Sequence, residues 1–236
     1  MKNLLHWLWP QYCLLCKEIT AGCSMCLACS NELPWSQHAC IQCGLPVAPT
    51  SSLQQCGACL TQPPPFTHTR ALFIYKSPIT HFITQLKFNR QLLYANLLGN
   101  LFADKFIKNS SSTALPECII PVPLHRRRLR QRGFNQALEI AKPLAKKLQL
   151  PIDFKTCIRT KHTRPQSELS AKKRQQNIKN AFTLKKPITA KHVAIVDDVM
   201  TTGNTVTELS ALLRNNGVTT IEIWCCARAA SLRSSQ

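Results

Sequence analysis

The sequence predicts an α/β protein in which a parallel sheet is flanked by helices and preceded by a small Cys-rich domain. Residues 193–196 are a short β-branched apolar run of the kind that is buried in a parallel sheet. They lead through a polar loop into an apolar periodicity from Val206 to Asn216, which predicts a helix with its stop signal. Nine of the 13 cysteines, by contrast, fall before residue 60. A chain of 236 residues has room for one α/β domain of about 150 to 200 residues and an appendage.

The cysteines of the first 60 residues predict structural zinc. Eight of them form Cys-x-x-Cys pairs, namely Cys13/Cys16, Cys26/Cys29, Cys40/Cys43 and Cys56/Cys59. Two such pairs supply the four thiolates of one tetrahedral zinc site, and a segment this short needs metal ligation to fold. We therefore expect two zinc sites. Either neighbouring pairs share a metal, or alternate pairs do so in a cross-braced arrangement, and the spacing fits both.

The N-terminal residues and the lack of long apolar runs indicate the compartment. Residues 1–9 contain an apolar run that is too short and too interrupted for a signal peptide, and we expect no membrane span in the chain. The sequence therefore predicts a cytoplasmic protein. In such a reducing compartment, paired cysteines indicate metal rather than disulfides.

A proline-rich segment at residues 61–66 predicts a stiff, extended linker. We expect the domain boundary here, with a zinc-binding domain at residues 1–62 and the α/β domain at residues 63–236. Apolar periodicity predicts the remaining elements of the second domain, which are strands at 71–75, 118–123 and 219–226 and helices at 79–88 and 92–107.

Positive charge is concentrated in two segments. The chain carries 30 Lys and Arg against 11 Asp and Glu, a net charge of +19, which attracts polyanions unless the protein is merely basic and soluble. Residues 124–137 form an arginine-rich loop between a strand and a helix that ends near Leu150, a setting suited to a multiply charged phosphate. Residues 159–182 predict either a solvated helix or a flap or nucleic-acid contact surface.

The loop at residues 200–205, called the phosphate loop below, has the features of an anion cradle. It offers successive backbone N–H groups, the hydroxyls of Thr201, Thr202 and Thr205, and the positive end of the following helix. Gly203 supplies a position where φ is free to be positive. The loop therefore predicts a phosphate site.

Two carboxylates, Asp197 and Asp198, precede this loop at the carboxyl end of the strand, where open α/β sheets place their ligands. A carboxylate pair suits vicinal hydroxyls or a phosphate-bound Mg²⁺, so a sugar phosphate satisfies both the pair and the loop. The alternative is an Asp pair that caps a loop whose threonines act as N-caps. That alternative leaves the glycine and the run of hydroxyls unexplained.

This strand, loop and helix resemble the motif by which type I phosphoribosyltransferases bind 5-phosphoribosyl 1-pyrophosphate (PRPP). The resemblance implies that Asp197 and Asp198 hold the ribose hydroxyls and act in catalysis, with Mg²⁺ bound alongside PRPP. It further implies that the loop encloses the 5′-phosphate through five residues, Thr201, Thr202, Gly203, Asn204 and Thr205.

The chain as a whole resembles the ComF family. The order of its motifs carries the resemblance: the four Cys pairs, Pro-Val-Pro-Leu at 121–124, Arg-Gly-Phe-Asn-Gln at 132–136, then Gln166, Leu169, Arg174 and Asn177 ahead of Ala181-Phe182, and Val-Asp-Asp-Val-Met-Thr-Thr-Gly at 196–203. The resemblance implies a type I phosphoribosyltransferase fold, with Arg128 and Arg132 in the arginine-rich PRPP-binding segment. It also implies a role in natural competence, or in the uptake and utilisation of DNA on the cytoplasmic side of the membrane.

Two functions from different classes are consistent with this resemblance. In the first, the protein is a phosphoribosyltransferase that displaces pyrophosphate from PRPP, with Asp197, Asp198 and Mg²⁺ stabilising the transition state. In the second, it is a non-catalytic adaptor for single-stranded DNA and uptake-machinery proteins, and PRPP or a nucleotide is only a regulatory ligand. Thr201 stands where hypoxanthine-type members carry a catalytic Asp, so a purine-base acceptor is not expected.

Overall fold

The computed structural model describes residues 11–20, 22–48, 54–109, 114–161 and 178–229. The chain divides into two compact units, Met1–Pro34 and Trp35–Gln236. The predicted linker at residues 61–66 lies inside the second unit, and the domain boundary expected there stays a prediction. Several sequence features lie outside the described residues, namely residues 1–9 and most of the second basic segment, with Gln166, Leu169, Arg174 and Asn177.

The described residues of the first unit, 11–20 and 22–34, contain little regular structure. Strands β1 (Gln11–Tyr12) and β2 (Ile19–Thr20) pair antiparallel, and the short helix α2 (Leu27–Asn31) follows. Cys26 is the N-cap of α2, and its Sγ accepts the backbone N–H of Cys29 at 3.5 Å. Few apolar side chains are buried here besides cysteines, so metal ligation has to supply much of the folding free energy.

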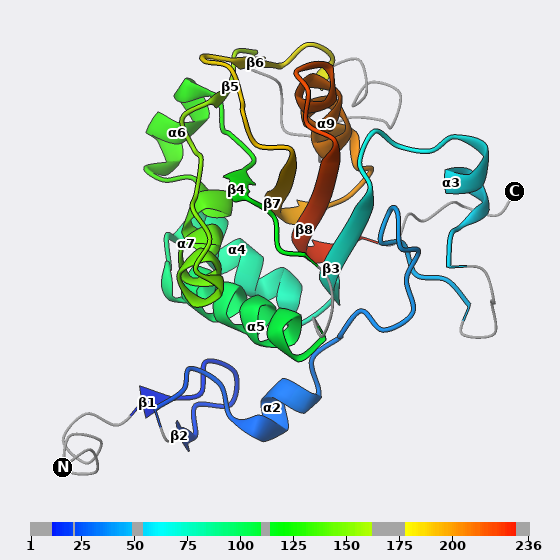
Figure 1. The fold of residues 1–236 in the computed structure, drawn as a ribbon. Coiled ribbons are helices and arrows are strands. Elements are labelled where there is room, and N and C mark those ends of the chain that lie inside the picture. The colour runs from blue at the N-terminus through cyan, green and yellow to red at the C-terminus, as the bar shows by residue number, and fades with distance from the viewer. Residues whose placement is uncertain (1–10, 21, 49–53, 110–113, 162–177, 230–236) are drawn as a thin grey trace, which may run out of the picture. The chain divides into compact units, whose positions relative to one another are not determined.

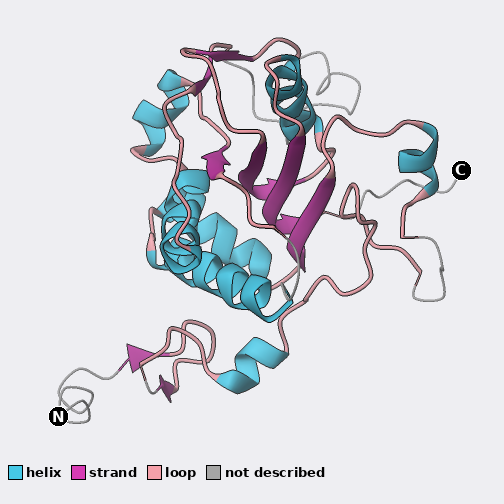
Figure 2. Ribbon diagram, viewed as in Figure 1, coloured by secondary structure: helices cyan, strands magenta, loops and turns pink. Residues whose placement is uncertain are grey.

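The second unit is built on a four-stranded parallel sheet in the order β3-β8-β7-β4 (Figures 1 and 2). Its strands are β3 (His68–Ile74), β4 (Cys118–Pro121), β7 (His192–Met200) and β8 (Thr220–Arg228). The central strands β7 and β8 are buried along almost their whole length, which explains why their sequences read as continuous apolar runs. The predicted parallel α/β architecture is confirmed.

Helices cover both faces of this sheet. The helices described in this unit are α3 (Gly57–Thr61), α4 (Ile79–Asn89), α5 (Leu93–Asn109), α6 (Arg126–Arg132), α7 (Gln136–Leu148) and α9 (Asn204–Asn215), of which α9 lies on one face and α5 on the other, while α3 lies apart from the sheet. Successive strand residues point to opposite faces. Ile195 therefore joins the apolar cluster that contains Leu213 of α9, whereas Trp224 stacks on Phe102 and Phe106 of α5 on the other face.

The arginine-rich segment is helical, although the sequence predicted a loop. His125 is the N-cap of α6, its Nδ1 accepts the N–H of Arg127 at 3.2 Å, and the helix ends at Gly133 with φ of +85°. Arginine, leucine and glutamine are good helix formers, so a cap at each end is enough for a short helix. The helix gives the arginines fixed and distinct directions.

A second small sheet was not predicted at all. Strands β5 (Cys157–Arg159) and β6 (Phe182–Leu184) pair antiparallel. Both are too short for a period of two residues to be recognised in the sequence. Phe182 and Cys157 nevertheless join the apolar cluster beneath α9, which holds this sheet against the main one.

Candidate functional site

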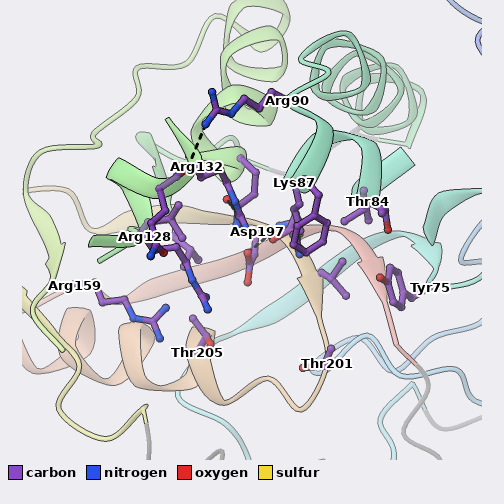
Figure 3. Close-up of a pocket in the computed structure, with 18 residues that line it drawn as sticks. Tyr75, Thr84, Lys87, Arg90, Arg128, Arg132, Arg159, Asp197, Thr201 and Thr205 are labelled. Carbon is purple, nitrogen blue, oxygen red and sulfur yellow. Dashed lines mark hydrogen bonds and ion pairs between the residues drawn. The ribbon is translucent and has the colours of Figure 1, made fainter. Parts of the chain in front are cut away.

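A cavity of about 700 Å³ opens at the carboxyl edge of the parallel sheet (Figure 3). Residues that end or follow strands line its floor, including Tyr75 after β3, Val122 after β4 and Asp197 in β7. Ligands of open α/β sheets bind at this edge because the loops that leave the strands converge there. The cavity thus lies where the sequence placed the candidate site.

The two carboxylates of β7 both line the cavity, and both are almost fully buried. They differ in their partners because consecutive strand residues point to opposite sides. Asp198 pairs through Oδ2 with the ammonium of Lys87 in α4, and its Oδ1 accepts the side-chain N–H of Gln136 at 3.3 Å. Asp197 Oδ1 accepts the backbone N–H of Asp198 at 2.9 Å.

These partners give the two acids opposite pKa shifts. Burial raises the pKa of Asp197 well above its ordinary value, and the neighbouring Asp198 carboxylate raises it further. Burial also acts to raise the pKa of Asp198, but the ammonium of Lys87 and the hydrogen bonds from Lys87, Asp197 and Gln136 together outweigh it and lower that pKa. Asp198 is therefore the charged member of the pair, and Asp197 is the member that most readily holds a proton.

The phosphate loop joins this pair to α9. Thr201 and Thr205 line the cavity, whereas the side chain of Thr202 is exposed. Gly203 is the N-cap of α9 with φ of +82°, and a Cβ atom at this position would lie 2.9 Å from Cε of Met200. The left-handed conformation favours glycine here, and a larger residue would also have to displace the methionine methyl group.

Cations surround the opening of the cavity. Arg128 and Arg132 of α6, Arg159 of β5 and Lys87 of α4 all line it. Burial lowers the pKa of Arg159 to about 10, and the nearby Arg128 adds to the shift, but the guanidinium of Arg159 stays charged at neutral pH. Several cations facing one cavity have a net attraction for a multiply charged anion.

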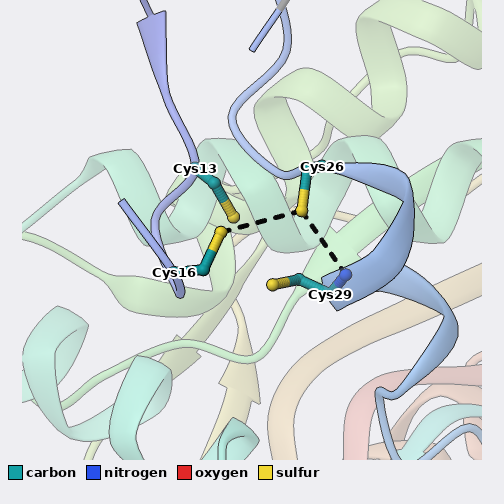
Figure 4. A group of neighbouring side chains, drawn as sticks. All are labelled: Cys13, Cys16, Cys26 and Cys29. Atoms are coloured by element: carbon teal, nitrogen blue, oxygen red, sulfur yellow. Dashed lines mark hydrogen bonds between the residues drawn. The ribbon is translucent and has the colours of Figure 1, made fainter. Parts of the chain in front are cut away.

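The first four-cysteine group lies in the first unit. The Sγ atoms of Cys13, Cys16, Cys26 and Cys29 lie within 4.8 Å of one another and converge on one point (Figure 4). The Sγ atoms of Cys16 and Cys26 are 3.8 Å apart. Tetrahedral ligation at a Zn–S distance of about 2.3 Å separates two sulfurs by about 3.8 Å, so this geometry fits Zn²⁺.

The second four-cysteine group belongs to the second unit and has the same geometry. Cys40, Cys43, Cys56 and Cys59 lie within 4.8 Å of one another, and the Sγ atoms of Cys43 and Cys56 are 3.6 Å apart. Burial acts to raise the pKa of Cys40, but the backbone N–H groups of Cys43, Cys56 and Gln42 outweigh it and lower the pKa to about 7. Neighbouring pairs share each group, so the structure selects sequential pairing over cross-bracing.

Comparison with known proteins supports the same organisation. Residues 4–60 match the double zinc ribbon domain, and residues 135–235 match the phosphoribosyl transferase domain. The DNA utilization protein YhgH of Shigella flexneri is 39% identical over 223 residues, which cover 93% of this chain and 97% of that protein. Competence protein F of Haemophilus influenzae is 39% identical over 212 residues, 88% of this chain and 90% of that protein. The chain belongs to the ComF family.

The ComF resemblance and the phosphoribosyltransferase fold with an N-terminal zinc ribbon are thus confirmed. A purine phosphoribosyltransferase structure from Pyrococcus horikoshii Ot3 is 20% identical and covers 56% of this chain and 70% of that chain, with a TM-score of 0.30. Among the described residues, no helix is both long and apolar enough to cross a membrane.

The structure brings together most of the ComF residues singled out in the sequence, and it adds others. Asp197, Asp198, Thr201, Thr205, Arg128 and Arg132 all line the cavity, whereas Thr202, Gly203 and Asn204 shape the loop without being among the lining residues. Three further residues line the cavity: Lys87, which the sequence analysis did not single out, Gln136, named there only within the 132–136 motif, and Arg159, named only as part of the basic segment 159–182. Lys87 gave no signal because a lone lysine at the end of an amphipathic helix is ordinary.

Proposed function

We propose that this ComF protein binds PRPP in the cavity at the carboxyl edge of the sheet. One observation carries the proposal: a buried carboxylate pair, a glycine-containing loop at a helix N-terminus and a set of cations all line the same cavity. PRPP has three chemically different parts, two ribose hydroxyls, a 5′-phosphate and a pyrophosphate. Each part has a matching group of residues here.

The ribose and the 5′-phosphate fit the two ends of the β7–α9 connection. Asp198, and Asp197 once it has lost its proton, accept hydrogen bonds from the 2′- and 3′-hydroxyls, since charged acceptors make the stronger hydrogen bonds. Thr201 and Thr205 face the 5′-phosphate with the N-terminus of α9 behind them, where the helix dipole favours negative charge.

The pyrophosphate fits the cationic side of the cavity. Arg128 and Arg132 are four residues apart on α6, and Lys87 lies close enough to reach the same ligand from α4. Binding shifts Lys87 from Asp198 toward the pyrophosphate, which leaves the carboxylate available to the ribose. Mg²⁺ neutralises part of the pyrophosphate charge when it is bound.

The same arrangement suits phosphoribosyl transfer. The bond between C1 of the ribose and the pyrophosphate oxygen breaks, its electron pair leaves with pyrophosphate, and an acceptor lone pair forms the new bond to C1. Arg128 and Arg132 stabilise the leaving group, while Asp197 and Asp198 stabilise the positive charge that develops on the ribose. The non-catalytic alternative retains the binding step without the transfer.

Titration calorimetry with PRPP and Mg²⁺ tests the binding. We expect Arg128→Gln and Arg132→Gln each to weaken PRPP at least tenfold, with a smaller effect on ribose 5-phosphate, which lacks the pyrophosphate. The control is Lys142→Gln, because Lys142 is an exposed cation whose ion pair with Glu139 is on the surface of α7. PRPP affinity that is unaffected by both arginine substitutions would contradict the proposal.

Pyrophosphate release separates the enzyme from the adaptor. Purified protein with PRPP, Mg²⁺ and a panel of nucleobases, nucleosides and single-stranded oligonucleotides is assayed for pyrophosphate. Release that depends on one acceptor and is lost in Asp198→Asn identifies a transferase. Tight PRPP binding without acceptor-dependent release identifies PRPP as a ligand of an adaptor.

A nucleic-acid contact is the second candidate function, and the two sides of α6 favour it. Arg128 and Arg132 line the cavity, whereas Arg126, Arg127 and Arg130 are exposed. Exposed arginines beside a phosphate site form a continuous path for the backbone of a single strand. This surface is consistent with a role in competence and DNA utilisation, the functions named for the relatives, on the cytoplasmic side of the membrane where thiolates stay reduced.

A further inference from the structure

Arg228 connects the second four-cysteine group to the phosphate loop. It ends β8 and is only 4% exposed. Its Nε donates to the carbonyl oxygen of Cys43 at 2.8 Å, and its Nη1 donates to that of Met200 at 2.9 Å and to that of Thr201. Nη1 also donates to the carbonyl of Ala229 at 3.0 Å. The buried guanidinium of Arg228 thus fixes the backbone both at Cys43, in the second four-cysteine group, and at Met200 and Thr201, in the phosphate loop.

The cysteine side of this connection is ordered by the thiolates. In the turn at residues 40–44, the backbone N–H groups of Gln42 and Cys43 point to the Sγ of Cys40, which the N–H of Cys56 also reaches at 3.3 Å. The carbonyls of Ile41, Gln42 and Cys43 in the same turn instead accept hydrogen bonds from β3 and β8 of the sheet. A metal that holds the thiolates therefore fixes the direction in which the Cys43 carbonyl points.

Thr69 of β3 anchors the same turn. Its backbone N–H donates to the Ile41 carbonyl at 2.8 Å, and its hydroxyl donates to the Gln42 carbonyl at 2.7 Å. A Cβ atom on Gly44 would lie 2.8 Å from Cγ2 of Thr69, so the turn packs closely on the strand. Three consecutive carbonyls of the turn accept hydrogen bonds from the sheet, those of Ile41 and Gln42 from Thr69 and that of Cys43 from Arg228.

The loop side of the connection leads directly to the cavity. The two carbonyls that Arg228 holds belong to Met200 and Thr201, the start of the phosphate loop, and Thr201 lines the cavity. Fixing a carbonyl fixes the plane of its peptide, and therefore the direction of the next N–H group. The Ala229 N–H also donates to the Met200 carbonyl at 3.0 Å, so Arg228 acts with it there and through its own bond at Thr201 to direct the first amides of the loop.

We infer that Arg228 is a positioning residue through which zinc at the second four-cysteine group sets the shape of the phosphate loop, and with it the affinity for the 5′-phosphate. The inference rests on the proposed PRPP site for its ligand. It assigns the second zinc a role beyond folding: loss of that zinc loosens a loop that contains none of its ligands. The first group provides the comparison, since its four cysteines lie in the other unit.

The test is a double-mutant cycle on the full chain. Arg228→Met removes all the donors at similar length, and Cys59→Ser weakens the second zinc site. Cys29→Ser, at the matching position of the first group, measures what loss of a zinc does by itself. Each protein is assayed for zinc content, for amide hydrogen exchange at residues 200–205, and for affinity toward PRPP and ribose 5-phosphate.

We expect Cys59→Ser to lose about one zinc per chain, to raise exchange in the loop at least tenfold, and to weaken both ligands at least tenfold. Arg228→Met should do the same to the loop and the ligands while it keeps its zinc. The double variant should be no worse than either single one, because both changes break one connection. Cys29→Ser should lose a zinc with less than a twofold change in the loop.

Any one of three results would overturn the inference. The amides of the phosphate loop could exchange in Arg228→Met at the wild-type rate, or the effects of the two substitutions could add in the double variant. Cys29→Ser and Cys59→Ser could also change exchange in the loop equally. If Arg228→Met does not fold, the milder substitutions Arg228→Lys and Thr69→Val decide it, since each should raise loop exchange in folded protein with zinc bound. Wild-type protein that does not bind PRPP would refute the proposed function alone, because the exchange measurements need no ligand.

Discussion

The two acids of β7 should respond differently when each is replaced by its amide. Asp198 is paired with Lys87, whose side chain is 22% exposed, while that of Asp198 is 5% exposed. Removing one partner of a buried ion pair costs about 3 to 5 kcal/mol, and partial solvation of Lys87 brings our expectation to roughly 2 to 3 kcal/mol for Asp198→Asn. Asp197→Asn removes a carboxyl whose pKa burial already raises. We expect it to cost no more than about 1 kcal/mol, the contribution of one hydrogen bond.

Urea unfolding of the three proteins measures these differences, and calorimetry with PRPP measures binding. Both variants should weaken PRPP, since Asp198→Asn loses a charged acceptor and Asp197→Asn loses a carboxyl group that becomes a charged acceptor above its raised pKa. Glu139→Gln is the matched control, because it also turns a carboxylate into an amide and breaks a lysine pair, but with Lys142 at the surface. Its cost should stay within about 0.5 kcal/mol. Equal stability losses for Asp197→Asn and Asp198→Asn, or unchanged PRPP affinity in both, would refute the reasoning.

Three further predictions concern zinc, nucleic acid and pH. Elemental analysis should find two zinc ions per chain. Replacing both Cys40 and Cys43 with Ser should also lower the melting temperature of the phosphoribosyltransferase unit, because the turn at residues 40–44 is hydrogen-bonded to β3 and β8. An unchanged melting temperature would instead support the domain boundary predicted between residues 62 and 63. Arg126→Glu with Arg130→Glu should flatten the salt dependence of single-stranded DNA binding, which filter binding at several salt concentrations measures; an unchanged slope would exclude this side of α6. PRPP affinity should rise as the pH rises through the raised pKa of Asp197, and Asp197→Asn should abolish that rise. The contribution of Asp197 to folding stability should instead decrease as the pH rises above about 4, because Asp197 loses its proton at a lower pH in the unfolded chain than in the folded one.

Local patterns carried most of the fold prediction. The strand, loop and helix around Asp197 and Asp198 combine a buried apolar run, a turn glycine and a capped amphipathic helix, and each signal lies within a few residues of the next. The elements observed at His68–Ile74, Ile79–Asn89 and Thr220–Arg228 agree with the predicted ones to within a few residues. Signals of this kind persist because burial and helix capping are local consequences of the sequence.

What the sequence did not reveal depends on contacts between distant segments. Lys87 meets Asp198 across 111 positions, and Arg228 meets Cys43 across 185. Neither residue has a spacing that marks it, because the partner is set by the sheet order. The helical form of the arginine-rich segment was missed for a different reason, since its charge was given more weight than its helix propensity. Cysteine pairing also required the fold, because both pairings satisfy the same spacing.

The position of β8 in the sheet has a consequence for how the protein is made. β8 is the last strand described along the chain, yet it lies in the interior of the sheet, between β3 and β7. β3 therefore cannot pair with β8 during synthesis until Glu222, the register partner of His68, has been made 154 residues later. Until then β3 and β7 each expose an unpaired apolar edge, and pairings this distant fold slowly. Nascent chains that stop short of β8 should consequently engage chaperones, because the sheet cannot close until β8 has been made.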